Sequence, residues 1–368
     1  MSTALKNLYS KAFFNSLSDC LGEVVPNFNK NVFLNQIFST EWDQLELKQR
    51  MRHITHVLGD FFSKEFHESA GYIKLLINNL EQKGYKETSI EFMFLPDFIE
   101  VYGINDFDTS IELIEIVTQF TSCEFAVRPF IINNQNEMLK QMFDWSNHKN
   151  HMVRRLASEG CRPRLPWAMA ISSLKKNPEP IIPILENLKD DSSEFVRRSV
   201  ANNLNDISKD NPQTVISLVK KWKGKTKETD ALTKHACRTL LKQGNSEIME
   251  LFGFGTIEKI KIVDLKVHNP IVKVGNYLEF SFKLINTDSI SSKIRLEYGV
   301  YYQKANGSLS KKVFKISEKD YLPKSTNIIN RKHSFKIITT RKFHIGEHQV
   351  SVIVNGKEFE KIGFKLTE

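Results

Sequence analysis

The spacing of apolar residues changes near Gly255 in this 368-residue chain, and this change limits the available folds. Before it, apolar residues recur every three or four positions, which is typical of helices with one buried face. After it, apolar and polar residues alternate, which is typical of strands with one buried face. The helical segments include IELIEIVTQF (111–120), PIIPILENLKD (180–190), PQTVISLVKKW (212–222) and ALTKHACRTLL (231–241). The alternating segments include YLEFSFKLI (277–285), IRLEYGVYY (294–302), HSFKIITT (333–340) and HQVSVIVNG (348–356).

The helical part contains an internal repeat. HMVRRLASEG (151–160) aligns with EFVRRSVANN (194–203) at a shift of 43 residues, within the range of HEAT-type two-helix repeats. The segments 122–130 and 232–241 are weaker relatives at irregular shifts. Because one helix pair cannot bury its apolar face alone, such pairs stack into a solenoid with one concave surface. We therefore predict an α-helical domain of HEAT-like repeats over residues 1–252, within a multidomain α + β protein.

The alternating part predicts an immunoglobulin-like β-sandwich over residues 256–368. The turn sequences NTDS, ANGS and VNGKE separate its short strands. This part is also basic: from Thr256 onward it has 21 lysines and arginines against 11 acidic residues, whereas the rest of the chain has 31 against 32. A basic domain fits a polyanionic partner such as nucleic acid, and a lysine-rich surface that only confers solubility fits the charge equally well.

Several classes of protein are disfavoured by what the sequence lacks. It has no apolar run of about eighteen residues, the length that spans a membrane, and its N-terminus has the pattern of an amphipathic helix rather than a signal peptide. The four cysteines form no CxxC pair, which argues against zinc or disulfides and favours a reducing cytoplasm. No P-loop, HExxH motif or paired-aspartate cluster supports a nuclease or phosphotransferase, so we expect no metal.

The repeated helix separates its charged residues from its packing residues. Residues three and four apart share a helix face, so the helix near His151 has one apolar stripe and one charged stripe. The same division recurs in the second copy, and a weaker copy has Glu124 one turn before Arg128. We therefore predict that three adjacent inner helices each place an acid and an arginine on one surface. The packing residues are Val153, Leu156, Ala157 and Gly160, then Val196, Ser199, Val200 and Asn203; the charged stripes are Arg155, Glu159 and Arg162, then Arg198, Asn202 and Asp206.

Two interpretations of these charged residues stay open. Arg154, Arg197 and Glu159 are explained equally well by ion pairs that hold neighbouring repeats in register. Glu124 and Asp206 are harder to explain in this way, because a cleft for a polyanion gains nothing from carboxylates unless they meet a positive charge on the ligand. After the first repeated helix, Pro166 fits the first turn of the next helix, which would place Trp167 at its N-terminal end. An indole there serves either a ligand or packing.

Four blocks of the helical part resemble a known family. LELKQRMRHI (45–54), SCEFAVRPFI (122–131), VRRLASEGCRPRLPW (153–167) and VRRSVANNLNDISKDNP (196–212) are similar to the AlkC-type DNA-3-methyladenine glycosylases, which are related to the HEAT-like AlkD enzymes. Some members of that family have a C-terminal immunoglobulin-like domain. The resemblance implies excision of cationic alkylated bases from double-stranded DNA, 3-methyladenine above all and 3-methylcytosine as a further candidate, without extrusion of the nucleotide. It implies no cofactor, because hydrolysis of an activated glycosidic bond needs none.

The chemistry that the resemblance implies suits the charged residues. Breaking the glycosidic bond moves positive charge onto the deoxyribose, and carboxylates close to the sugar stabilise that charge. One carboxylate can also orient the attacking water. We expect Glu124 and Asp206 to be the catalytic carboxylates, Trp167 to contact the cationic base, and Arg155 and Glu159 to support them.

Cationic side chains are expected to bind DNA phosphates and to make affinity fall with salt. The candidates in the helical part are Arg162, Arg164, Arg197, Lys209, Lys234 and Arg238. Those in the sandwich are Lys304, Lys311, Lys312 and Arg331, which a solvated lysine-rich hairpin explains as well. We expect a monomer. The alternative function is a non-catalytic HEAT-repeat scaffold that binds DNA or a protein.

Overall fold

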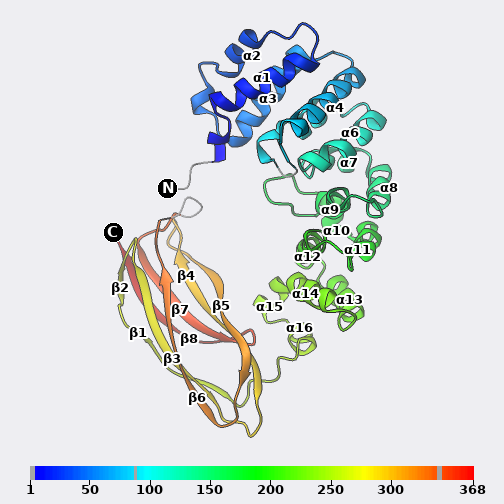
Figure 1. Cartoon of the computed structure of the whole chain (residues 1–368). Coiled ribbons are helices and arrows are strands. Elements are labelled where there is room, and N and C mark those ends of the chain that lie inside the picture. Colours follow the sequence, from blue (N-terminus) through cyan, green and yellow to red (C-terminus); the bar gives the residue numbers. More distant parts are fainter. Residues whose placement is uncertain (1–4, 87–88, 338–341) are drawn as a thin grey trace. The chain divides into compact units, whose positions relative to one another are not determined.

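The computed structural model of the chain describes residues 5–86, 89–337 and 342–368 (Figure 1). Every candidate site residue named above lies in these ranges. Contacts divide the chain into two compact units, Met1–Val215 with Trp222–Ala236, and Ile216–Lys221 with Cys237–Glu368. The predicted order of helical repeats followed by a β-sandwich is confirmed, and no helix in the described ranges is both long and apolar enough to cross a membrane. The domain boundary at residues 252–256 stays a prediction.

Helices occupy the chain as far as Leu251. Short 3₁₀ segments lie at Leu5–Leu8, Trp42–Gln44, Ile90–Phe92 and Glu179–Ile181. The α-helices are α1 (Lys11–Val24), α2 (Lys30–Ile37), α3 (Leu47–Phe61), α4 (Phe66–Gln82), α5 (Phe94–Tyr102), α6 (Phe107–Phe120), α7 (Val127–Asn133), α8 (Gln135–Trp145), α9 (His151–Gly160), α10 (Ser172–Lys176), α11 (Ile182–Leu188), α12 (Glu194–Ile207), α13 (Pro212–Trp222), α14 (Lys227–Ala236), α15 (Arg238–Gln243) and α16 (Ser246–Leu251).

The helices of the first unit stack in chain order in two rows (Figure 1). In one row α3 contacts α5, and further along α9 contacts α12 and α12 contacts α14. In the other row α4 contacts α6 and α8 contacts α11. The predicted packing stripes of α9 and α12 are buried, with Val153, Leu156, Val196 and Val200 all fully inaccessible. The helices with the repeated sequence are therefore neighbours in one row, as the 43-residue repeat predicts.

The first arginine of each repeated pair has the same structural role. Arg154 Nη1 donates to the carbonyls of residues 148 and 149, and Arg197 Nη1 donates to those of residues 191 and 192. Each arginine thus binds the loop that precedes its own helix. Arg154 also holds Asp191 through two hydrogen bonds of 2.6 and 3.0 Å. Burial works to raise the pKa of Asp191, but hydrogen bonds from Arg154 and from the Ser193 N–H bring it below its usual value.

Three details of the predicted helical part are wrong. Glu124 lies in the turn before α7 and not on a helix with Arg128, because α7 begins at Val127. Pro166 lies in a loop and does not open a helix, since α10 begins only at Ser172. The segment 231–241 is not one helix, because α14 ends at Ala236 and α15 begins at Arg238.

The second unit contains a sandwich of two sheets (Figure 1). One sheet has the order β1-β3-β6 and the other β2-β8-β7-β4-β5, and all pairs are antiparallel except β2 with β8. Alternate residues of β3, such as Leu278, Phe280 and Phe282, are buried between the sheets. The strands are β1 (Ile260–Val267), β2 (Ile271–Lys273), β3 (Tyr277–Asn286), β4 (Ser292–Gln303), β5 (Leu309–Tyr321), β6 (Ser325–Ser334), β7 (Gly346–Val354) and β8 (Lys357–Thr367).

One predicted strand is displaced. The alternating segment 333–340 enters a strand only at residues 333 and 334, residues 335–337 are outside any strand, and residues 338–340 lie outside the described ranges. The strand is β6, which pairs with β3 from Tyr277↔Ser334 to Asn286↔Ser325. Its polar sequence conceals it, because most of its side chains are exposed or only half-buried.

Replacing Gly160 by alanine should lower the free energy of unfolding by about 1–3 kcal/mol, the usual cost of overpacking. The new Cβ would lie 2.5 Å from Val127 Cγ2 and 2.9 Å from Met142 Cε, where α9 meets α7 and α8. The control is Gly71→Ala in α4, where a Cβ meets nothing within 4 Å. That change should be neutral or raise stability by about 0.5–1 kcal/mol, since alanine favours helix. Urea unfolding followed by circular dichroism measures both, and equal effects would contradict the close helix contact at Gly160.

Candidate functional site

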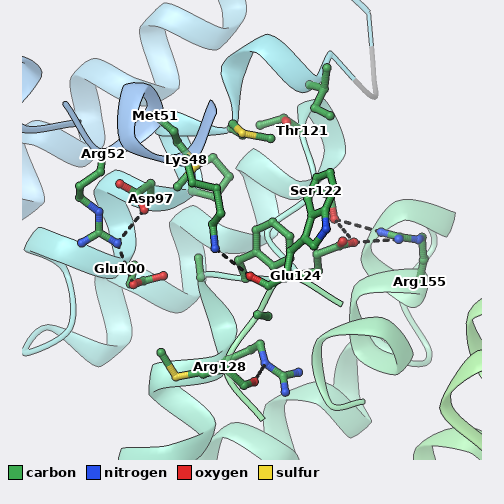
Figure 2. Close-up of a pocket in the computed structure, with 18 of the residues that line it drawn as sticks. Lys48, Met51, Arg52, Asp97, Glu100, Thr121, Ser122, Glu124, Arg128 and Arg155 are labelled. Carbon is green, nitrogen blue, oxygen red and sulfur yellow. Dashed lines mark hydrogen bonds and ion pairs between the residues drawn. The ribbon is translucent and has the colours of Figure 1, made fainter. Parts of the chain in front are cut away.

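A cavity of about 410 Å³ opens in the first unit between α3, α5, α9 and the loop that contains Trp167 (Figure 2). Its walls are largely apolar, and four of the chain's eight methionines line it. Charged side chains stand on two sides, with Glu124 and Arg155 on one and Arg52, Asp97 and Glu100 on the other (Figure 2). The methionines are Met51, Met93, Met152 and Met169. An apolar cavity with a few converging polar groups is the usual form of a ligand site.

Glu124 and Arg155 form one corner of this cavity (Figure 2). Arg155 Nη2 lies 2.7 Å from Glu124 Oε2, and the Ser122 hydroxyl donates to the same oxygen at 2.9 Å. Arg155 Nη1 in turn donates to Ser122 Oγ, and its guanidinium lies 4.5 Å from the Phe195 ring centroid. The Glu124 side chain is 20% exposed. The carboxylate is therefore held in place while part of it stays accessible from the cavity.

Glu124 is the first member of a row of alternating charges that runs from the turn before α7 to the end of α12. Arg155 Nη2 is 3.8 Å from Glu159 Oε1, and Arg162 Nη1 is 2.6 Å from the same oxygen. Arg162 Nη2 then reaches Asp206 Oδ2 at 2.8 Å, and Lys209 Nζ reaches Asp206 Oδ1 at 2.8 Å. We call these six residues, Glu124, Arg155, Glu159, Arg162, Asp206 and Lys209, the charge row. It contains three carboxylates and three cations, so its formal charges balance.

The row becomes more buried toward its middle. The side chains of Glu159 and Arg162 are each 7% exposed and that of Asp206 is 2% exposed, whereas that of Lys209 is 38% exposed. Buried charges persist only when they are paired, and each buried member here has an opposite charge on at least one side. The structure thus brings together four of the five residues predicted to be catalytic and two of those predicted to bind DNA. Asp206 does not line the cavity at Glu124.

The second charged wall of the cavity was missed by sequence reasoning. Arg52 Nη2 lies 2.8 Å from Asp97 Oδ1 and 3.0 Å from Glu100 Oε1, and the buried Thr55 hydroxyl donates to Asp97 Oδ2. Burial is the main effect on Glu100 and raises the pKa of its carboxyl. The available signal was an acid inside the apolar run FLPDFIEV, since a carboxylate at a core position needs a partner.

Trp167 lies in the loop between α9 and α10 and lines the same cavity. It is 64% exposed, whereas the other three tryptophans are at most 5% exposed. Its φ of 66° is a left-handed backbone conformation that bulky residues rarely adopt. The Lys48 ammonium donates to its carbonyl at 2.7 Å. The packing interpretation of Trp167 therefore does not fit its exposure.

Arg128 is fully buried and has no carboxylate at hydrogen-bond distance among the described residues. Its Nη1 donates to the carbonyls of Gly160 and Arg162, at 2.8 and 2.9 Å, and its Nε donates to that of Met169 at 2.7 Å. Burial lowers the pKa of Arg128 to about 10, so it stays protonated at neutral pH. Arg128 lines the same cavity as Glu124, but its hydrogen bonds go to backbone carbonyls at the two ends of the Trp167 loop.

The remaining candidates for DNA binding in the helical part differ in how free their charge is. Arg164 binds Asp210 through two hydrogen bonds of 2.6 and 2.8 Å and lowers the pKa of that carboxyl. Arg197 donates hydrogen bonds to the carbonyls of residues 191 and 192. Lys234 lies on α14 and Arg238 begins α15, and both are half-buried. Lys209 combines exposure with a place in the charge row.

The sandwich candidates lie around the hairpin of β4 and β5. Lys304 and Lys312 are exposed and line a cavity of about 200 Å³ together with Lys342 and His344. Lys311 pairs with Glu358 at 3.0 Å, and Arg331 donates to the Ile316 carbonyl. Lys304 and Lys312 are therefore the sandwich candidates whose positions suit an anion best.

The cysteines are poor candidates for nucleophiles. All four are buried, and burial raises the pKa of Cys161 and of Cys237 to about 12, so neither thiol is ionised at neutral pH. Burial also raises the pKa of Cys123. In the described part of the chain, no group of three or more His, Cys, Asp or Glu residues could hold a metal ion.

Comparisons with known proteins give consistent results. Residues 34–240 match the family model described as DNA alkylation repair enzyme, and residues 261–368 match the C-terminal immunoglobulin-like domain of an uncharacterised protein, YhaZ. The chain is 40% identical to the uncharacterised protein YhaZ of Bacillus subtilis, over 98% of this chain and 99% of that protein. It is similar to the Pseudomonas fluorescens alkylpurine DNA glycosylase AlkC bound to DNA containing an abasic site analog, with 33% identity, a TM-score of 0.92 and all of both chains covered.

Arg162 and Arg164, two residues apart, should differ sharply in their effect on stability. Arg162→Met leaves the buried carboxylates of Glu159 and Asp206 without their shared partner, and we expect a loss of about 3 kcal/mol in the free energy of unfolding. Arg164→Met removes a partly exposed pair and should cost about 1 kcal/mol or less. Urea unfolding at neutral pH measures both, and similar losses would contradict a structural role for the charge row.

Proposed function

The chain belongs to the DNA alkylation repair enzyme family, and we propose that it is a DNA glycosylase that excises cationic alkylated bases from duplex DNA. The proposed substrates are 3-methyladenine first and 3-methylcytosine second. The observation that carries the proposal is the charge row, in which three carboxylates lie in the DNA alkylation repair region and are kept aligned by arginines. The 33% identity to a DNA-bound AlkC over the whole chain supports it.

Glu124 is proposed to stabilise the charge that develops during the reaction. A cationic base leaves readily, and the deoxyribose then acquires oxocarbenium character. A carboxylate that is already fixed stabilises this charge without having to reorganise. Both hydrogen-bonding partners of Glu124 in the described ranges contact Oε2, so Oε1 is available to the sugar or to the attacking water.

Asp206 is proposed to become available only when DNA is bound. In this structure Arg162 binds its Oδ2 and Lys209 binds its Oδ1. Because the Lys209 side chain is 38% exposed, a DNA phosphate can compete for its ammonium. That exchange would release Oδ1 while Arg162 keeps the carboxylate aligned. Glu159 and Arg155 would act by holding the other members of the row in place.

Trp167 is proposed to contact the cationic base through the face of its indole, an interaction of about 0.5–2 kcal/mol. Its 64% exposure allows this contact at the surface of a duplex, and we propose that the nucleotide is not extruded. The reaction needs no cofactor in this proposal. The enzyme is proposed to act as a monomer in the bacterial cytoplasm.

The alternative is a scaffold that binds DNA or a protein without catalysis. One observation favours it: both oxygens of Asp206 are engaged in ion pairs, and the pair with Arg162 connects the end of α9 to α12, as a purely register-setting role requires. The two functions differ in whether the carboxylates can be neutralised without loss of activity.

Release of free base from methylated duplex DNA in EDTA, resolved by chromatography, tests the function. We expect 3-methyladenine from the wild type, and a fall of at least about 100-fold for Glu124→Gln and for Asp206→Asn, because each removes charge stabilisation from the transition state. Glu115→Gln is the matched control, since Glu115 accepts from Trp145 on α8 and is not among the residues lining the cavity. Circular dichroism checks folding. DNA binding without base release from the wild type would favour the scaffold instead.

The sandwich is proposed to bind DNA phosphates through Lys304 and Lys312. Replacing both by alanine should weaken binding to duplex DNA about tenfold at low salt and flatten the dependence of log Kd on log salt by about one to two. The control, Lys273→Ala with Lys365→Ala, removes the same charge from the β2 and β8 edge. Fluorescence anisotropy over a salt series measures the slope, and equal effects of the two pairs would show that only net charge matters.

A further inference from the structure

We infer that Lys48 is a positioning residue that holds Trp167 in the conformation needed for catalysis, across the cavity and 119 positions away in sequence. This inference rests on the proposed function for the chemical role of Trp167. Its structural part, that Lys48 fixes the indole, stands on contacts alone.

The backbone of Trp167 needs an external restraint. A φ of 66° is unfavourable for a residue with a Cβ, and no glycine lies in the loop from Cys161 to Ile171 to absorb the turn. Such conformations persist where surrounding contacts impose them, and they concentrate at functional sites. The indole itself is mostly exposed, so its own packing cannot supply the restraint.

Arg128 fixes the two ends of the loop but not its tip. It binds the carbonyls of Gly160 and Arg162 at the start and that of Met169 at the end. The Ile171 N–H also donates to the Pro163 carbonyl, which closes the loop at its base. Between these anchors, the Ala168 N–H donates to the Leu165 carbonyl at 3.3 Å and closes the turn around Trp167, but this bond does not engage the carbonyl of Trp167 itself.

Lys48 supplies the contact at the tip. It projects from α3 (Figure 2). Its ammonium donates to the Trp167 carbonyl at 2.7 Å and lies 5.3 Å from the centroid of the Phe125 ring. Phe125 follows Glu124 directly, so one ammonium contacts both the loop of the indole and the turn of the carboxylate. Lys48 therefore couples the placement of Trp167 to that of Glu124.

Loss of this contact should affect the chemical step more than DNA binding. We expect Lys48→Met, which keeps most of the aliphatic stem, to slow single-turnover base release about tenfold while changing the Kd for duplex DNA with an abasic-site analog by less than about twofold. Lys48→Arg retains a donor of similar reach and should recover most of the rate. The matched control is Lys64→Met, because Lys64 also donates to a backbone carbonyl, that of Gly59, and does not line the cavity.

Tryptophan fluorescence gives a readout that is independent of activity. Trp42, Trp145 and Trp222 are 5%, 1% and 0% exposed, so acrylamide quenches chiefly Trp167. Lys48→Met should change the quenching constant and the emission maximum, and Lys64→Met should change neither. Unchanged quenching together with an unchanged rate would overturn the inference. Unchanged quenching with weakened DNA binding would overturn it too, and would show that Lys48 contacts a phosphate instead.

The two proposals fail in different ways. If the wild type releases no base, the proposed function fails, yet the fluorescence of Lys48→Met still shows whether the lysine fixes the indole. If the wild type is active and Lys48→Met matches it in rate and quenching, only the positioning role fails.

Discussion

Arg162 is the side chain on which the rest of the site depends. It is almost fully buried, and it joins Glu159 at the end of α9 to Asp206 near the end of α12. Both carboxylates are buried, and a buried charge persists in a folded protein only when an opposite charge pairs with it. Because Arg155 lies one turn before Glu159, the same helix also reaches Glu124. The same ion pairs therefore both connect α9 to α12 and align the three carboxylates.

The cavity adds a second constraint, which acts on the backbone instead of on charge. Trp167 is exposed in a conformation that costs free energy, and the loop around it is anchored by cations that bind carbonyl oxygens. Burying the Arg128 guanidinium costs free energy, because no carboxylate of the described residues pairs with it. Such an arrangement stabilises one conformation of the Trp167 loop and contributes little to the stability of the whole fold. It sets the loop beside Glu124, where the charge row ends.

The sequence reveals those parts of the site that follow from local periodicity. The stripe of Arg155, Glu159 and Arg162 follows from residues three and four apart on a helix, and the 43-residue repeat places Asp206 on a neighbouring helix. Contacts such as Lys48 with Trp167 depend on how distant helices stack, so no local pattern contains them. Glu124 was expected on a helix because the helical spacing of α7 can be extended back to it. No glycine or proline in the preceding residues 121–126 marks where the helix begins. The predicted position of strand β6 was wrong because an edge strand with few buried side chains shows no clear alternation of apolar and polar residues.

The balance of charge in the row explains how carboxylates can work beside a polyanion. Three exposed carboxylates would repel DNA, but three paired ones produce little net field at a distance, because the fields of opposite charges a few ångströms apart largely cancel. Salt screens what remains beyond a Debye length of about 8–10 Å. In the proposed mechanism, DNA phosphates compete for the most exposed cation, Lys209, and leave Arg155 and Arg162 in place because their side chains are far less exposed. The negative charge of the row would then grow locally, and only after DNA has bound. That charge would stabilise a cationic base and an oxocarbenium-like sugar, whereas a neutral base would gain little from it. The exposure of Lys209 would therefore determine both the selectivity for cationic bases and the moment at which the carboxylate becomes available.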